Sequence, residues 1–224
     1  ITHEGFVKEA AEAFSFVSNS QEAISPEPSL YFGSLVTDRR DDPSDDVTVA
    51  LAYESCSATS GDAVVLKVVR EMIGDYSKAS GVGSNGSTRL GELVGAEDLA
   101  SSFQTFFQTY DDVGLFGVVM NSQGKHLDDL VCEVCSDLVR IAHNARPAEV
   151  FRAKARLHNQ VLLAHDGATA ISQKTATEVA ENSVGHAIKS TLDMIEEVTV
   201  DHVREVSLRR FTNVEPAVVG IGNT

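Results

Sequence analysis

The chain has 224 residues, of which 42% are hydrophobic, and 33 acidic against 18 basic side chains give it a formal net charge of −15. This length and apolar content are sufficient for a substantial core in one or two domains. Nucleic acid is excluded as an expected partner, because phosphate binding needs clusters of Lys and Arg and the sequence shows none. No apolar run reaches the ~20 residues needed to cross a bilayer. We therefore expect a soluble or peripheral protein without a membrane span.

The acidic charge and the cysteines give further expectations. The charge favours cationic ligands, although composition alone favours the simpler interpretation that it keeps the protein soluble. Cys56, Cys132 and Cys135 are too few for a disulfide framework and indicate a reducing compartment. The chain opens at Ile1 without a basic flank and an apolar core, so we expect that no signal peptide remains.

The N-terminal residues predict a helix followed by a linker. Residues 2–16 place apolar side chains near one face of a short amphipathic helix. Residues 17–29 are polar and proline-containing, a composition typical of linkers. We expect residues 1–16 to be the last helix of a preceding N-terminal domain, residues 17–29 to be a linker, and residues 30–224 to form a C-terminal domain.

Strand and helix patterns follow in the rest of the chain. Extended segments are predicted over residues 29–37, 47–55, 101–110, 113–120 and 215–223. Helices are predicted over residues 61–76, 88–95, 124–143, 172–196 and 199–211, and over a segment with Pro147 in its first turn. Ser60 and Thr199 are the expected N-caps of the helices that follow them. This order predicts an α+β fold, with helices packed on one face of a mixed, largely antiparallel sheet.

Three glycines match the dinucleotide-binding pattern G-x-G-x-x-G at Gly81, Gly83 and Gly86. That turn must leave a buried strand, so that the N-terminus of the next helix meets the pyrophosphate. Here the preceding residues read as a helix end and a polar loop. A flexible loop is therefore the better interpretation.

Cys132 and Cys135 form a C-x-x-C pair inside the predicted helix over residues 124–143. Reactive pairs lie at a helix N-terminus, where the dipole lowers the thiol pKa, and a structural zinc ion needs about four ligands. We therefore expect structural thiols that are buried or half-buried. A thiol-redox or nucleotide-binding domain is kept as a distant alternative.

The histidines and acidic pairs do not complete a catalytic motif. His3 opens a partial H-E-x-x-H, with Val7 in place of the second His, and His202 opens a partial H-x-x-E-H, with Val206 in that place. We expect surface histidines there. Solvated carboxylates are expected at the acidic pairs Asp41–Asp42, Asp128–Asp129 and Glu196–Glu197. The residues themselves predict no catalytic group and no metal ligand in this chain, and they leave any substrate-binding residues unknown.

Five segments, taken in order, resemble a known family: DRRDDPSDDVTVALAYES, GVGSNGSTRLGELV, SSFQTFFQTYDDVGLFGVV, FRAKARLHNQVLLAHDGATAIS and EPAVVGIGN. They are similar to the C-terminal domain of the pitrilysin-type inverted-zincin metallopeptidases. The closest branch contains the β-type mitochondrial processing peptidases and the core 1 proteins of cytochrome bc1 complexes. The pattern at Phe103–Gln104 and from Tyr110 through Leu115 favours the β type over the α type.

The resemblance implies a scaffold half that is not an enzyme by itself. In this family the zinc motif lies in the N-terminal domain, so any zinc would be held there and this chain would need no cofactor. Active single-chain relatives use an Arg and a Tyr of the C-terminal domain to hold the substrate carbonyl. Val94 and Ser101 stand at those positions here, so that role is not carried over.

The function implied is that of a non-catalytic C-terminal half of a β-type processing peptidase, acting as a core structural subunit of respiratory complex III. The expected location is peripheral, on the matrix side of the mitochondrial inner membrane. Expected partners are a separate N-terminal half, an α-type or core 2 subunit and other complex III subunits. The alternative is the non-catalytic half of an active zinc-dependent presequence peptidase, in which the acidic charge would attract basic presequence peptides.

Overall fold

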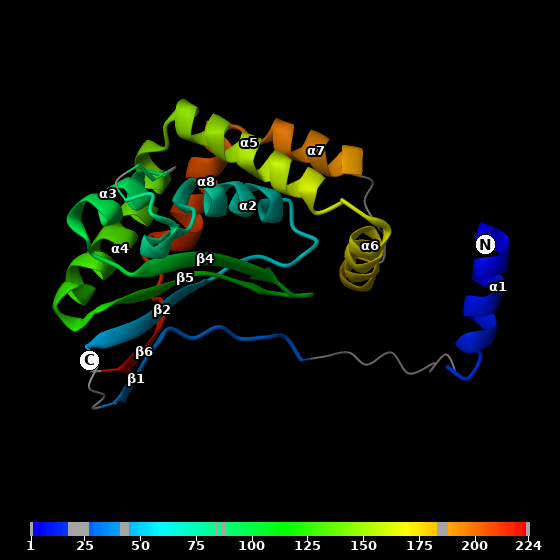
Figure 1. Ribbon diagram of the computed structural model, residues 1–224, viewed down its shortest axis with the longest axis horizontal. Helices are drawn as coiled ribbons and strands as arrows, with labels where there is room; N and C mark the ends of the chain where they lie inside the picture. The colour runs from blue at the N-terminus through cyan, green and yellow to red at the C-terminus, as the bar shows by residue number, and fades with distance from the viewer. Residues whose placement is uncertain are drawn as a thin grey trace.

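A six-stranded sheet in the order β1-β6-β2-β5-β4-β3 organises the computed structural model, which describes residues 2–17, 27–40, 45–83, 85–86, 88–182 and 188–222 (Figure 1). The strands are β1 (Ser34–Arg39), β2 (Asp46–Glu54), β3 (Tyr76–Ser77), β4 (Ser102–Thr109), β5 (Gly114–Gln123) and β6 (Ala217–Gly222). β1 pairs parallel with β6, and the other neighbouring strands pair antiparallel. The predicted mixed, largely antiparallel sheet is confirmed.

Helices cover one face of this sheet in two layers (Figure 1). The helices of the described residues are α1 (His3–Ala13), α2 (Asp62–Ile73), α3 (Arg89–Glu97), α4 (Leu127–Asn144), α5 (Pro147–Leu163), α6 (Ala168–Asn182), α7 (Ile188–Glu197) and α8 (Val200–Phe211). α2 contacts β4, α4 contacts β5 and α8 contacts β2, while α5 and α7 pack over α2. The prediction of helices on one face is therefore confirmed.

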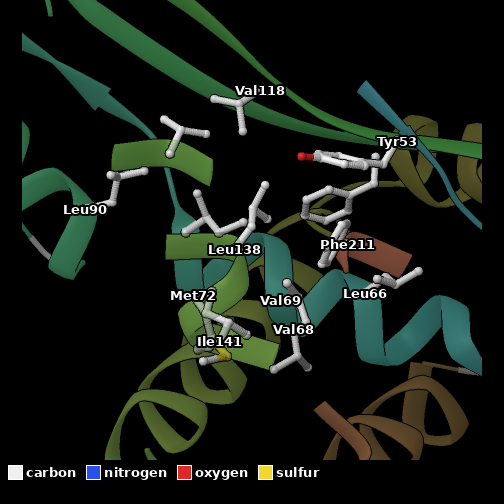
Figure 2. Packing of buried hydrophobic residues seen from close by; sticks show 14 of the residues in the cluster. Tyr53, Leu66, Val68, Val69, Met72, Leu90, Val118, Leu138, Ile141 and Phe211 are labelled. Atoms are coloured by element: carbon white, nitrogen blue, oxygen red, sulfur yellow. The ribbon is translucent and has the colours of Figure 1, made fainter. Parts of the chain in front are cut away.

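The core lies between the sheet and the first layer of helices. Alternate residues of β2 point into it, and all four are buried: Val47, Val49, Leu51 and Tyr53. The Tyr53 ring meets Phe211 of α8 edge to face, with centroids 5.4 Å apart, and Figure 2 shows this contact near Val118 of β5 and Leu138 of α4. Burial of each such side chain contributes about 1.5–3 kcal/mol, so the strand's alternation fixes which face receives the helices.

The helix starts follow the expected chemistry with one correction. Thr199 caps α8 and Pro147 is the first residue of α5, as predicted. The N-cap of α2 is Gly61 and not Ser60, so that prediction is wrong by one position. Ser60 still contributes, because its Oγ accepts a hydrogen bond from the Asp62 backbone N–H at 3.3 Å.

The predicted extended segment over residues 29–37 forms a strand only from Ser34 onward. Tyr31 explains the late start, because its hydroxyl donates to the carbonyls of Ala52 and Glu215 and accepts from the Ala217 N–H. A side chain thus occupies the position that strand pairing would otherwise fill.

Two other sequence predictions meet the limits of the described residues. The helix predicted over residues 172–196 is divided into α6 and α7, and residues 183–187 between them lie outside the described part. α1 forms where the first helix is predicted, and most of the predicted linker, residues 18–26, lies outside the described part. The division into domains at these residues stays a prediction.

Candidate interaction surface

The face of the sheet opposite to the helices is not covered by any helix of the described residues (Figure 1). Strand register brings together on it the residues that alternate with the core positions. We call this surface the open sheet face. Its apolar members are Val36, Ala50, Ala52, Phe106, Leu115, Gly117, Val119, Val219 and Ile221, and uncharged polar side chains border them at Thr48, Gln104, Gln108 and Asn121.

Close packing makes the middle of the open sheet face continuous. Phe106 of β4 pairs with Gly117 of β5, and a Cβ at Gly117 would lie 2.5 Å from the Phe106 ring. The ring therefore lies directly against the glycine backbone, a contact that any larger residue would prevent. β6 continues the apolar surface with Val219, which is 41% exposed, and Ile221.

The open sheet face carries little charge. Among the described strand residues that point to this side, the carboxylates are Asp38 of β1 and Asp46 and Glu54 of β2. An exposed apolar surface of this kind marks an interaction site.

The edge of the sheet at β1 extends this surface. All six residues of β1 are exposed: Val36, on the open sheet face, is 55% exposed, and Leu35, on the opposite side of the strand, is 74% exposed. β1 pairs only with β6 among the described strands, so its outer backbone groups face outward. An exposed strand edge with apolar side chains is a template for pairing with another polypeptide.

The glycine motif lies in a loop, as predicted. It follows β3, a two-residue strand that pairs antiparallel with β4 at the edge of the sheet. Gly81 and Gly83 adopt positive φ angles, and a Cβ at Gly86 would lie 2.7 Å from the Gly91 backbone. A dinucleotide site needs a buried parallel strand before the turn, so the glycines serve the turn into α3.

The two cysteines of the C-x-x-C pattern, Cys132 and Cys135, lie within α4 and away from its ends, as predicted. Cys135 is half-buried, as expected, but Cys132 is exposed, so the expectation of a buried or half-buried thiol is wrong for Cys132. Burial raises the pKa of the Cys135 thiol, and it also raises the pKa of Cys56 in the core. A raised pKa keeps a thiol protonated and unreactive at neutral pH, which is the opposite of a redox site.

The two partial zinc motifs lie apart in the fold. His3 begins α1 and His202 lies in the first turn of α8, where its ring is near the Thr199 N–H; both are exposed, as predicted. Within the described ranges, no group of three or more His, Cys, Asp or Glu side chains could hold a metal ion.

The acidic pairs do not converge on a site. Asp128 and Asp129 are exposed in the first turn of α4, and Glu196 and Glu197 are exposed at the end of α7, as predicted. Asp41 and Asp42 lie outside the described residues.

In the part of the chain that the structure describes, no helix is both long and apolar enough to span a bilayer.

The two positions aligned with substrate-holding residues of active relatives are Val94 and Ser101, and the loss of that role stays a prediction. Val94 is fully buried in α3. Ser101 precedes β4, and its backbone forms hydrogen bonds with Lys78 and Asn121.

The open sheet face was not predicted from the sequence. A signal for it was present in β2, where Ala50 and Ala52 stand at positions that usually carry polar residues in a strand with one solvated face.

The fold is an α+β domain whose sheet has one face covered by helices and one face left open within the described residues. The chain belongs to the peptidase M16 family: residues 1–157 match the family model described as "Peptidase M16 inactive domain". This membership confirms the resemblance to the C-terminal domain of the family.

Individual relatives place the chain within the family. It is 31% identical to the mitochondrial-processing peptidase subunit beta of Dictyostelium discoideum, over 99% of this chain and 48% of the relative. It is 30% identical to the cytochrome b-c1 complex subunit 1, mitochondrial, of Rattus norvegicus, over 99% of this chain and 47% of the relative. The chain thus spans about half the length of the curated relatives it matches.

A solved structure shows the same fold. A chain of complex III2 from Candida albicans, with Inz-5 bound, matches with a TM-score of 0.87 at 21% sequence identity. The match covers 100% of this chain and 53% of that chain.

Proposed function

We propose that this chain is the non-catalytic C-terminal half of a β-type processing peptidase and acts as a core structural subunit of respiratory complex III. It works in mitochondria, peripherally on the matrix side of the inner membrane. Its partners are a separate N-terminal half, an α-type or core 2 subunit and other complex III subunits. Any zinc is held by the N-terminal half.

The open sheet face is the observation that carries this proposal. A sheet with one face covered by helices and the other apolar is stable when a second layer covers that other face. The chain matches about half the length of its relatives, and in this proposal the N-terminal half supplies that second layer. α1 supports the same interpretation, because it has no buried residues although Phe6 and Phe14 are apolar and exposed.

A second candidate function is the non-catalytic half of an active presequence peptidase. The mitochondrial-processing peptidase subunits beta among the relatives favour it. In that setting basic presequence peptides are the substrate, and the zinc-holding half performs the chemistry. Among its described residues the open sheet face contributes three carboxylates to an acidic field, Asp38, Asp46 and Glu54, so attraction of presequences would depend mainly on other surfaces.

Native purification through a tag on this chain separates the two candidates. Co-purification of haem-containing subunits supports the structural role in complex III. A haem-free assembly with peptidase activity that a chelator abolishes supports the second candidate. Recovery of the chain without any partner would contradict both.

A charge introduced on the open sheet face tests directly whether the N-terminal half covers that face. Val219→Asp places a carboxylate on β6 at a residue that is 41% exposed, and it should abolish recovery of the N-terminal half. Leu208→Asp on α8 is the matched control, because Leu208 is 44% exposed on the helical side. Retention of the partner by Val219→Asp, with unchanged stability, would show that the partner covers another surface.

A further inference from the structure

The outer edge of β4 borders a hollow of about 320 Å³ between the sheet, α2 and α5. The residues that line it are Lys67, Arg70, Gln104, Thr105, Phe106, Phe107 and Leu157. A second hollow of about 800 Å³ shares Lys67 and Leu157 with it and reaches Thr109 at the end of β4. The two hollows are neighbours along the strand because they share these two residues, and we call them together the β4 groove.

This edge of β4 has a neighbouring strand for only part of its length. β3 pairs with Ser102 and Phe103, and no other described strand pairs with the outer side of β4. At Thr105 two side chains replace the strand: Asp75 Oδ1 accepts from the Thr105 N–H at 2.8 Å, and Arg70 Nε donates to its carbonyl at 3.0 Å.

The next outward-facing residue is Phe107. Backbone groups of a strand alternate between its two sides, so the N–H and C=O of Phe107 point to the same side as those of Thr105. In the described part of the chain no hydrogen bond partner reaches them. Thr109 is the next residue in this alternation, and its carbonyl accepts a long hydrogen bond from Gln108 Nε2 at 3.5 Å. The groove therefore offers both backbone groups of Phe107 and the N–H of Thr109 for strand pairing.

The first hollow is lined by cations, whereas the second hollow also contains Glu178 and Glu197 beside Lys174. Two cations, Lys67 and Arg70, line the first hollow, and no acidic residue is among its described lining residues. Arg70 is engaged with Glu71 and Asp75. Lys67 is exposed and makes no ion pair within the described ranges. Its ammonium is therefore available to a carboxylate on a bound chain.

We propose that β4 binds an extended acidic segment of a partner polypeptide by strand addition. The segment would run antiparallel to β4, in line with β3, and its backbone would pair with Phe107 and Thr109. Alternate side chains would enter the hollow between Leu157 and Lys67, where an aliphatic residue packs and an acidic residue pairs with the lysine. Backbone pairing supplies affinity in this mode, and the pocket supplies specificity.

Fluorescence anisotropy on the native complex that contains the full chain tests this binding. The probe is a fluorescein-labelled hexapeptide of alternating Val and Thr with one central Glu. The same peptide with Lys in place of Glu should bind about fivefold more weakly. A version N-methylated on alternate residues should bind at least about tenfold more weakly, because it cannot donate to the strand.

Paired variants locate the site. Lys67→Glu should reverse the preference between the Glu and Lys peptides. Lys189→Glu is the matched control, because it makes the same charge change at an exposed position of α7 that does not line the groove, and it should leave the preference unchanged. No saturable binding, or equal binding of the Glu and Lys peptides, would overturn the proposal.

Hydrogen exchange gives an independent readout at single residues. The bound Glu peptide should slow exchange of the Phe107 and Thr109 amides, while those of Phe106 and Gln108, already paired with β5, should change little. Protection confined to β1 would place the peptide at the opposite edge of the sheet and would overturn the assignment to β4. Self-association of the chain that the peptide blocks would identify a second copy as the occupant instead.

Discussion

Asp137 of α4 and Arg89 of α3 form an ion pair at 2.7 Å although 48 residues separate them in the chain. The Asp137 side chain is 1% exposed, and its Oδ1 also accepts from Arg140 Nε at 2.8 Å. Arg140 in turn donates to Glu149, in the first turn of α5, at 2.9 Å. An ion-pair network centred on Asp137 and Arg140 of α4 therefore links α4 to α3 and to α5.

Replacing this carboxylate with an isosteric amide should destabilise the protein. Asp137→Asn removes the negative charge that compensates Arg89 and Arg140, so we expect the free energy of unfolding to fall by about 2–3 kcal/mol. Asp128→Asn is the control on the same helix, where an exposed carboxylate contributes less than about 1 kcal/mol through the helix dipole. Urea denaturation followed by circular dichroism measures both, and equal losses would show that Asp137 contributes no more than a surface charge.

The stability of the protein should also depend on the close contact between Phe106 and Gly117, where one added methyl group has no room. Gly117→Ala would place Cβ 2.2 Å from the Leu51 carbonyl oxygen and 2.5 Å from the Phe106 ring, so the strand or the ring must move. We expect a loss of about 1–3 kcal/mol in the free energy of unfolding.

Gly61→Ala is the control for that substitution. It has no atom within 4 Å of the added Cβ and a helical backbone conformation, so it should change stability by no more than about 0.5 kcal/mol. Thermal denaturation ranks the two variants. An unchanged midpoint for Gly117→Ala would mean that the open sheet face tolerates movement of Phe106.

Sequence reasoning was most successful where periodicity is enforced by burial. The alternation in β2 and the stripe of α4 are set by which side chains enter the core, so both elements appear where they are predicted. The start of β1 was missed because it depends on the Tyr31 hydroxyl reaching residues 21 and 184 positions away. Pairings over such distances leave no local pattern.

The candidate surfaces were beyond sequence reasoning for a related reason. The open sheet face exists because the described helices that pack on the sheet all lie on its other side. The β4 groove exists because part of the outer edge of β4 has no neighbouring strand among the described residues. Both depend on strand order, which places β3 beside only the first two residues of β4. The positions of the glycine motif in a loop and of the C-x-x-C pattern inside a helix could be predicted, because both depend on the neighbouring residues alone.

The thiols should differ in reactivity with a neutral alkylating reagent. Cys132 is exposed, whereas burial raises the pKa of Cys56 and Cys135 and also restricts access to them. At pH 7.5, about one unit below the ordinary thiol pKa, we expect fast labelling of Cys132 and slow labelling of the other two. Peptide mass spectrometry after timed quenching gives each rate, and the unfolded protein is the control in which the three rates converge. Fast labelling of Cys135 in the native protein would revive the thiol-redox alternative.

Glu71 should make stability depend on pH in the direction opposite to that of a typical surface carboxylate. It is buried in α2, where it accepts hydrogen bonds from Arg70 and Gln160, and burial raises its pKa above the ordinary 4.5 in spite of the opposing effect of Arg70. A folded pKa above the unfolded value means that the folded state favours the proton. The contribution of Glu71 to stability is therefore fully present below the ordinary pKa and is lost as the pH rises through the folded pKa.

A comparison with Glu71→Gln isolates this effect, because the variant has no proton to release at this position. The free energy of unfolding of the native protein, minus that of Glu71→Gln, should fall as the pH rises from about 4 to about 7. Glu205→Gln on α8 controls for the loss of an exposed carboxylate. Urea denaturation at pH steps across this range supplies the curve. A difference that rises with pH would mean that the ion pair with Arg70 outweighs burial, and Glu71 would then stabilise the α2–α5 contact as a charged group.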